Sequence, residues 1–143
     1  MATTAASSEL ARTAWSAVTE LFLGRRPKIN AELAELGLHP VQALALRFLE
    51  PGEPRPMNTL AGLLHCDASN VTNIADRLES AGMVERRGAD GDRRVKTLVL
   101  TPHGADVRAR VAAIWSEPPE GFAALAPEDL QALQRILAQA LGH

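Results

Sequence analysis

The sequence is poor in aromatic residues: phenylalanine and tryptophan make up 3% of its 143 residues, and tyrosine is absent. Leucine, valine, isoleucine and alanine must therefore build the hydrophobic core. The apolar share of 46% is ordinary for a globular chain, and the length predicts a single domain over residues 1–143. No run of about 18 apolar residues occurs, so we expect no membrane-spanning helix.

Cysteine occurs once, at Cys66, which excludes an internal disulfide. The N-terminal segment MATTAASSEL lacks the charged start and the apolar middle of a secretory signal. Together these features predict a soluble cytoplasmic protein. We expect Cys66 to be a small buried hydrophobe rather than a redox sensor, because the neighbouring Asp67 has the wrong charge to activate a thiol.

Residue types that bind metals or catalyse reactions are scattered along the chain. His65, Cys66 and Asp67 are adjacent, but neighbouring residues at a helix end point in different directions and rarely converge on one ion. The sequence holds no evident nucleophile–base pair, phosphate-binding loop or paired carboxylates. It therefore predicts no metal, no cofactor and no enzymatic activity.

The net charge of −2 does not indicate nucleic-acid binding, but the charges are unevenly distributed. Between Arg77 and Arg110 there are eight lysine or arginine residues against five acids. Beyond residue 110 the chain has four acids and a single arginine, Arg135. This asymmetry is consistent with an anionic partner for one face of the molecule. A solvated hairpin is the alternative, and charge alone favours it.

Hydrophobic periodicity predicts helices along most of the chain. Residues 8–25 form the first, Pro27 ends or kinks it, and KINAELAELG makes a short second helix that stops at Gly37. Further helices are expected at 40–50, with Pro40 in its first position, and at 57–66. The segment PGEPRP between them has the composition of a loop.

The segment DASNVTNIADRLESAG predicts a helix from residue 68 to about 81. Asp67 is suited to cap its N-terminus, and Gly82 to end it in a left-handed turn. The buried stripe would consist of Val71, Ile74, Ala75 and Leu78.

Two strands follow, MVERR and RRVKTLVL, joined by the turn GADGD. Helices are then expected from 102 to about 116 and from 127 onward. Two helices, a short connection and a hairpin make a winged helix-turn-helix. The predicted fold class is thus mainly α with a two-stranded β-wing over residues 38–101. The regions 8–36 and 102–143 are helical and apolar on one face, so we expect them to be buried in a homodimer.

The helix after Asp67 exposes short polar side chains near its start: Ser69, Asn70, Thr72 and Asn73. Such residues are poor helix formers, so helix stability does not explain their presence on an exposed face. Asparagine pairs with adenine in the major groove, and serine or threonine bonds to bases or phosphate. We therefore predict contacts with double-stranded DNA bases, and we assign phosphate contacts to Arg77 and Arg86. A solvated polar face is the alternative.

The predicted wing carries a second candidate set. Asp92 precedes Arg94 by two residues, so its carboxylate can hold the guanidinium and direct it outward. An arginine at a hairpin tip fits the narrow minor groove of A·T-rich DNA. Arg93 and Lys96 are expected to contact phosphates.

The segments GLHPVQALALRFL, LAGLLHCDASNVTNIADRLESAGMVERR and DGDRRVKTLVLTPHG resemble successive blocks of the MarR-type transcriptional regulators. The resemblance implies a homodimer that represses genes until a small ligand or an oxidant releases it. It also implies that Asp92 and Arg94 order the wing. Some relatives sense peroxide through a cysteine near the chain start, which Cys66 does not match. His39 and Ala126 depart from the family by replacing better capping residues.

A family-type effector pocket would lie between the terminal helices and the winged region. Trp15, Phe22 and Trp115 are candidates for its lining, and interface core is the alternative for each. The sequence as a whole therefore predicts a DNA-binding transcriptional regulator, a ligand-responsive repressor that reads a palindromic operator. The alternative is a winged-helix protein-interaction module that does not bind DNA.

Overall fold

The computed structural model describes residues 2–89 and 91–143, together with their side chains except at residues 2, 3, 89, 92 and 93. The elements follow in the order α1 (Ala2–Glu35), α2 (Pro40–Arg47), β1 (Arg55–Pro56), α3 (Met57–Leu64), α4 (Ala68–Ser80), β2 (Val84–Ala89), β3 (Asp92–Leu100), α5 (Pro102–Ser116), the short 3-10 helix η1 (Glu120–Ala124) and α6 (Pro127–Leu141). This mainly helical chain with a small antiparallel sheet confirms the predicted fold class.

The chain divides into two compact units. The first consists of the N-terminal stretch as far as Arg25 together with Glu117–His143, and so holds most of α1, η1 and α6. The second is Arg26–Ser116, which holds the last turns of α1, the helices α2 to α5 and the sheet. Helix α1 contributes to both units.

The core of the second unit is aliphatic, as the shortage of aromatic residues requires. All four residues of the predicted α4 stripe are buried, namely Val71, Ile74, Ala75 and Leu78, which confirms the helical periodicity. Every other helix of the unit adds to this core, as does the sheet. The largest fully buried side chains are Leu33, Leu46, Leu49, Leu60, Leu78, Leu98, Val84 and Val111.

The predicted end of the first helix at Pro27, with a separate second helix after it, is wrong, because α1 continues through Pro27 to Glu35. A proline inside a helix costs about 3 kcal/mol. The turns beyond it bury Ile29 and Leu33, which are 8% and 0% exposed. Burial of two such side chains contributes about 3–6 kcal/mol, enough to offset the proline. Gly37 does terminate the helix as predicted, with φ of 74°.

Helix α2 begins at Pro40, as predicted, but ends at Arg47 rather than at residue 50. Glu50 precedes Pro51, and a residue before proline avoids the helical conformation, which explains the earlier end. The N-terminus is held by Gln42, whose Oε1 accepts the backbone N–H of His39 at 3.1 Å.

Local chemistry sets the ends of α4 as predicted. The Asp67 carboxylate accepts the backbone N–H of Asn70 at 2.8 Å. At the other end Gly82 has φ of 72°, and the backbone N–H of Met83 donates to the Leu78 carbonyl at 2.9 Å. Between α3 and α4, His65 adopts the left-handed conformation with φ of 52°. Helices α3 and α4 pack together as a helix-turn-helix.

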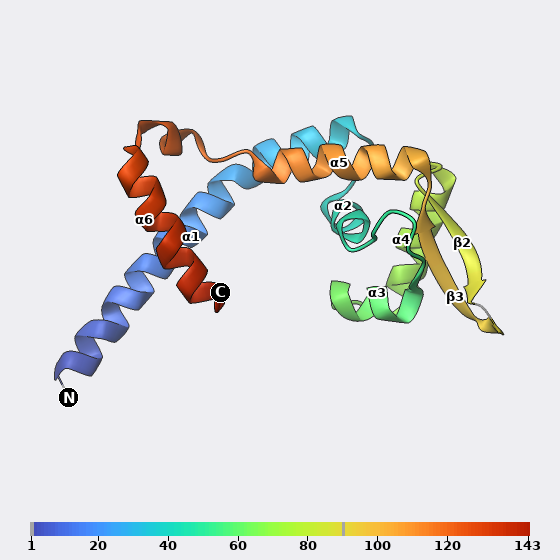
Figure 1. Ribbon diagram of the computed structural model, residues 1–143, viewed down its shortest axis with the longest axis horizontal. Coiled ribbons are helices and arrows are strands. Elements are labelled where there is room, and N and C mark those ends of the chain that lie inside the picture. Colours follow the sequence, from blue (N-terminus) through green and yellow to red (C-terminus); the bar gives the residue numbers. More distant parts are fainter. Residues whose placement is uncertain (1, 90) are drawn as a thin grey trace. The chain divides into compact units, whose positions relative to one another are not determined.

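The sheet has the order β1-β3-β2 and is antiparallel throughout. Strands β2 and β3 form the predicted wing beside α4, with Val84 opposite Leu100 and Arg86 opposite Leu98 (Figure 1). The short strand β1, which lies in the predicted loop, was not expected. It pairs with the other edge of β3, a position that tolerates Pro56 because an edge strand needs fewer donors.

Helices α5 and α6 match their predicted ranges, and η1 was not predicted. Ala126 provides no side-chain cap to α6. Among the described residues no helix combines the length and the apolar character needed to cross a bilayer. Within the same residues, no group of three or more histidine, cysteine, aspartate or glutamate side chains is arranged to hold a metal ion.

Candidate nucleic-acid interface

The solvent face of α4 carries the four short polar residues predicted to read bases. Ser69, Asn70, Thr72 and Asn73 are all exposed, because the opposite stripe of the helix is buried in the core. Thr72 donates its hydroxyl to the Ala68 carbonyl at 2.8 Å, which leaves its oxygen able to accept a further bond. The face is therefore lined by groups that can pair with base edges.

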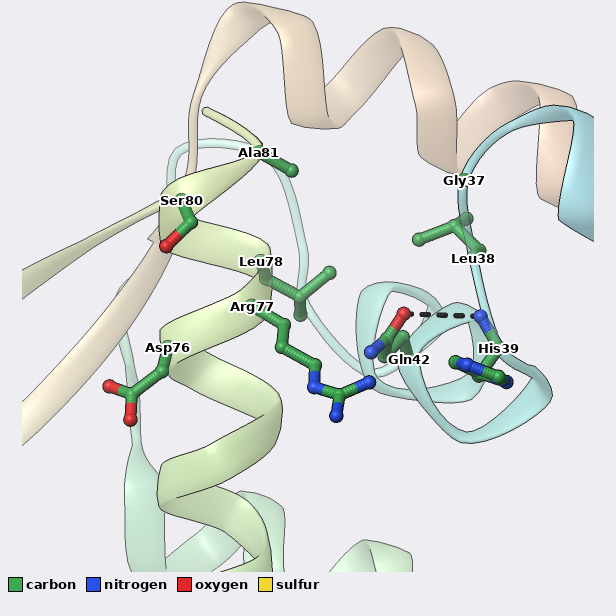
Figure 2. Close-up of a pocket in the computed structure, with 9 residues that line it drawn as sticks. All are labelled: Gly37, Leu38, His39, Gln42, Asp76, Arg77, Leu78, Ser80 and Ala81. Atoms are coloured by element: carbon green, nitrogen blue, oxygen red, sulfur yellow. Dashed lines mark hydrogen bonds between the residues drawn. The ribbon is translucent and has the colours of Figure 1, made fainter.

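One flank of α4 faces the start of α2. Asn70, Asn73 and Arg77 line a groove of about 820 Å³ with His39 and Cys66. The adjoining pocket, about 520 Å³, is drawn in Figure 2, where Arg77 extends toward His39 and Gln42 while Asp76 points away from them. Arg77 thus lies on the same side of the helix as Asn73, as the spacing predicted.

The other flank of α4 faces the wing. A groove of about 380 Å³ is lined by residues of α3, α4 and β3, namely Met57, Asn58, Ala61, Ala68, Val71, Thr72, Arg94, Val95 and Lys96. It brings Thr72 of the polar helix face together with two wing cations, Arg94 and Lys96, which are themselves exposed. The two predicted sets of DNA contacts are therefore neighbours in the fold.

Arg86 has protein partners that sequence reasoning did not foresee. Its Nη2 donates to the Asp76 carboxylate and to the Thr72 carbonyl, the latter at 3.4 Å. Its backbone N–H donates to the Glu79 carboxylate at 3.3 Å. A signal was present, because alternation along β2 puts Arg86 on the same side as the buried Val84 and hence toward the helix. The predicted phosphate contact of Arg86 has to compete with these bonds.

The side chains of Asp92 and Arg93 lie outside the described residues, so the proposed Asp92–Arg94 pair stays a prediction. Nearby on β2, Arg87 is paired with Glu85 at 3.1 Å on the exposed face of the strand. Strand β2 thus directs Arg86 toward α4 and the next arginine toward solvent.

The three aromatic residues predicted near an effector belong to different units. Trp15 and Phe22 lie in the first unit and are 71% and 61% exposed. Trp115 is half-buried in the second unit, where the Arg47 guanidinium lies 5.6 Å from its ring centre. Their role in ligand binding stays a prediction. Cys66 is half-buried and packs against the core of the second unit.

Comparison with known proteins finds similar sequences for the winged helix-turn-helix region. Residues 36–95 match the model of the MarR family. The transcriptional repressor MprA of Escherichia coli strain K12 is 38% identical over 77 residues, which are 52% of this chain and 44% of the repressor. The chain thus aligns with less than half the length of this curated relative.

Solved structures extend the likeness along the chain. AbsC, a MarR family transcriptional regulator from Streptomyces coelicolor, is 28% identical, has a TM-score of 0.67 and is matched over 92% of each chain. A MepR mutant from S. aureus, solved bound to an oligodeoxyribonucleotide, has 20% identity and a TM-score of 0.66 over 90% of this chain and 96% of its own. The winged helix-turn-helix of this chain is thus similar in sequence to the MarR family, and its fold is similar to that of MarR family structures over most of its length.

Proposed function

We propose that this protein is a sequence-specific, DNA-binding regulator of transcription. The observation that carries the proposal is the groove at which Thr72 of the exposed α4 face meets Arg94 and Lys96 of the wing. A helix with short polar side chains can enter the major groove, and cationic residues beside it can follow the DNA backbone into the minor groove. The DNA-bound MepR mutant supports the proposal by showing this fold on DNA.

In this mechanism Ser69, Asn70, Thr72 and Asn73 read base edges. Arg94 enters the minor groove and Asp92 orients it. The remaining cations contact phosphates, which fix the register of the protein on the duplex. They are Arg77, Arg93 and Lys96.

A homodimer is part of the proposal. The first unit exposes large apolar side chains on α1 and α6, among them Leu10, Trp15, Phe22, Ile136 and Leu141. Exposed apolar surfaces of this kind are typical of interfaces between subunits. A twofold dimer would read a palindrome with half-sites about 34–36 Å apart.

Repression is the proposed sign of regulation, because the matched relative MprA is a transcriptional repressor. We further propose that a small molecule controls binding, with Trp15, Phe22 and Trp115 as candidate contacts. Such a regulator works where the chromosome lies, so the proposed location is the cytoplasm.

The test is fluorescence anisotropy of the full chain on duplexes selected from random DNA. We expect Arg94→Ala to weaken binding by about tenfold or more, as loss of a charged hydrogen bond would. Asp92→Ala should have a milder effect. Arg135→Ala, an exposed arginine of α6, is the matched control and should bind as the unmodified chain does.

The alternative is a winged-helix protein-interaction module, and the net charge of −2 favours that alternative. The salt dependence of DNA affinity separates the two. Each phosphate contact steepens the fall of log affinity with log salt by about 0.9. Failure to bind duplex DNA at low salt, or a flat salt response, would favour the interaction module.

A further inference from the structure

Arg86 lies where the wing joins the recognition helix. Its guanidinium contacts two residues one turn apart on α4, Thr72 through the carbonyl and Asp76 through the carboxylate. Its backbone N–H is held one turn further along by Glu79. Position 86 of β2 is therefore fixed to α4 over about two turns of the helix.

This contact lies at the base of the projecting hairpin. Arg86 is opposite Leu98, and the strands continue from there toward the turn at Gly91. Arg94 lies four residues from Leu98 along β3, on the side of the turn. At the usual rise of a strand the two residues are about 13 Å apart. A tilt of about 20° at the base would move Arg94 by roughly 4 Å, which is most of the minor-groove width of about 6 Å.

Asp76 itself lies on the exposed surface of α4, where its side chain is 54% exposed. A carboxylate on a helix that enters DNA is repelled by phosphates unless it is neutralised. The ion pair with Arg86 supplies that neutralisation and uses the same charge to hold the wing. The Arg86 side chain is 29% exposed and that of Asp76 54%, and an ion pair with this much access to solvent adds little to folding stability, so stability alone does not account for the arrangement.

We infer that Arg86 and Asp76 are positioning residues that fix the wing relative to the recognition helix, so that Arg94 reaches the minor groove when α4 occupies the major groove. This inference rests on the proposed DNA-binding function. It replaces the direct phosphate contact expected for Arg86 with an indirect role, in which Arg86 acts on DNA through Arg94.

The experiment measures the factor by which Arg94→Ala weakens binding to one selected duplex, in several backgrounds of the full chain. In the unmodified chain we expect a factor of about ten. In the Arg86→Gln and Asp76→Asn backgrounds this factor should fall to about two or less, because Arg94 of a displaced wing no longer contributes to DNA affinity. Arg87→Gln is the matched control: this neighbour pairs with Glu85 on the exposed face, and the factor should stay near ten.

Asp76→Asn keeps the size of the side chain and carries the test if Arg86→Gln does not fold. A merely structural role would lower stability and leave the Arg94 factor unchanged in both backgrounds, which would overturn the inference. A factor that stays near ten while Arg86→Gln lowers the salt slope by about 0.9 would make Arg86 a phosphate contact and also overturn it. If the unmodified chain binds no duplex, the proposed function fails and this inference fails with it.

Discussion

The carbonyl oxygen of Met83 lies so close to Gly104 that a β-carbon at position 104 would be 1.8 Å from it. The approach brings the start of α5 against the turn that follows α4. Thr101 holds the same joint, because its hydroxyl donates to the Gly82 carbonyl at 2.5 Å and accepts the Gly104 N–H at 2.9 Å. Only glycine fits at position 104, because a β-carbon there would clash with the backbone of Met83. A change of side-chain rotamer cannot relieve a clash with backbone atoms.

Gly104→Ala should destabilise the protein by about 3 kcal/mol, the upper range for overpacking, despite the better helix propensity of alanine. Urea unfolding measures the change as a shift in midpoint at constant slope. Gly62→Ala in α3 is the matched control, since no atom lies within 4 Å of its new β-carbon, and it should stabilise by about 0.5–1 kcal/mol. Equal midpoints for the two variants would show that the joint at Met83 yields easily.

Asp67→Ala should cost about 1 kcal/mol, because the Asn70 N–H loses its capping carboxylate at the first turn of α4. Asp67→Asn keeps an accepting oxygen and should cost only a few tenths of a kcal/mol. Chemical denaturation of both variants gives the comparison. If the alanine variant is as stable as the asparagine variant, the cap contributes nothing to stability.

Features that depend on neighbouring residues in the chain could be predicted from the sequence. The cap at Asp67, the left-handed end at Gly82 and the buried stripe of α4 are of this kind, as is the polar face at Ser69–Asn73. Features that depend on distant partners could not. The continuity of α1 through Pro27 rests on burial of the residues beyond it, and β1 exists only because β3 offers a free edge.

The candidate site divides in the same way. The exposed face of α4 follows from helical periodicity, and its place beside Lys96 follows from the order of the elements. The partners of Arg86 required the packing of β2 on α4, because Asp76 is ten residues away and nothing in the sequence selects it from the other acids.

His65→Gly should raise stability by about 0.5–1 kcal/mol. The residue has φ of 52°, a left-handed conformation that costs a residue with a side chain about 1–2 kcal/mol. Glycine removes this strain, but it also increases the conformational entropy of the unfolded chain, which cancels part of the gain in stability. Gly82→Ala tests the reverse, since its φ is 72° and no atom lies within 4 Å of the added β-carbon, so only backbone strain acts. It should lower stability by about 1 kcal/mol.

Thermal melting at one fixed protein concentration compares these two variants, because the melting temperature of a dimer depends on concentration. Opposite shifts of a few degrees are expected. A loss of stability in His65→Gly equal to that in Gly82→Ala would mean that the imidazole makes a compensating interaction in the turn between α3 and α4.

Trp15→Glu should dissociate the proposed homodimer. Trp15 is 71% exposed on α1 of the first unit, among other apolar side chains, and a twofold interface would receive the new carboxylate twice. An unpaired charge buried in an interface costs about 3 kcal/mol or more, which raises the dimer dissociation constant by roughly 100-fold.

Sedimentation equilibrium should find twice the chain mass of 15.3 kDa for the unmodified protein and the single-chain mass for the variant at low micromolar concentration. Val41→Glu is the matched control, because Val41 is an exposed apolar residue of α2 in the second unit and its replacement should leave the mass unchanged. A Trp15→Glu protein that stays dimeric would mean that the subunits associate through another surface.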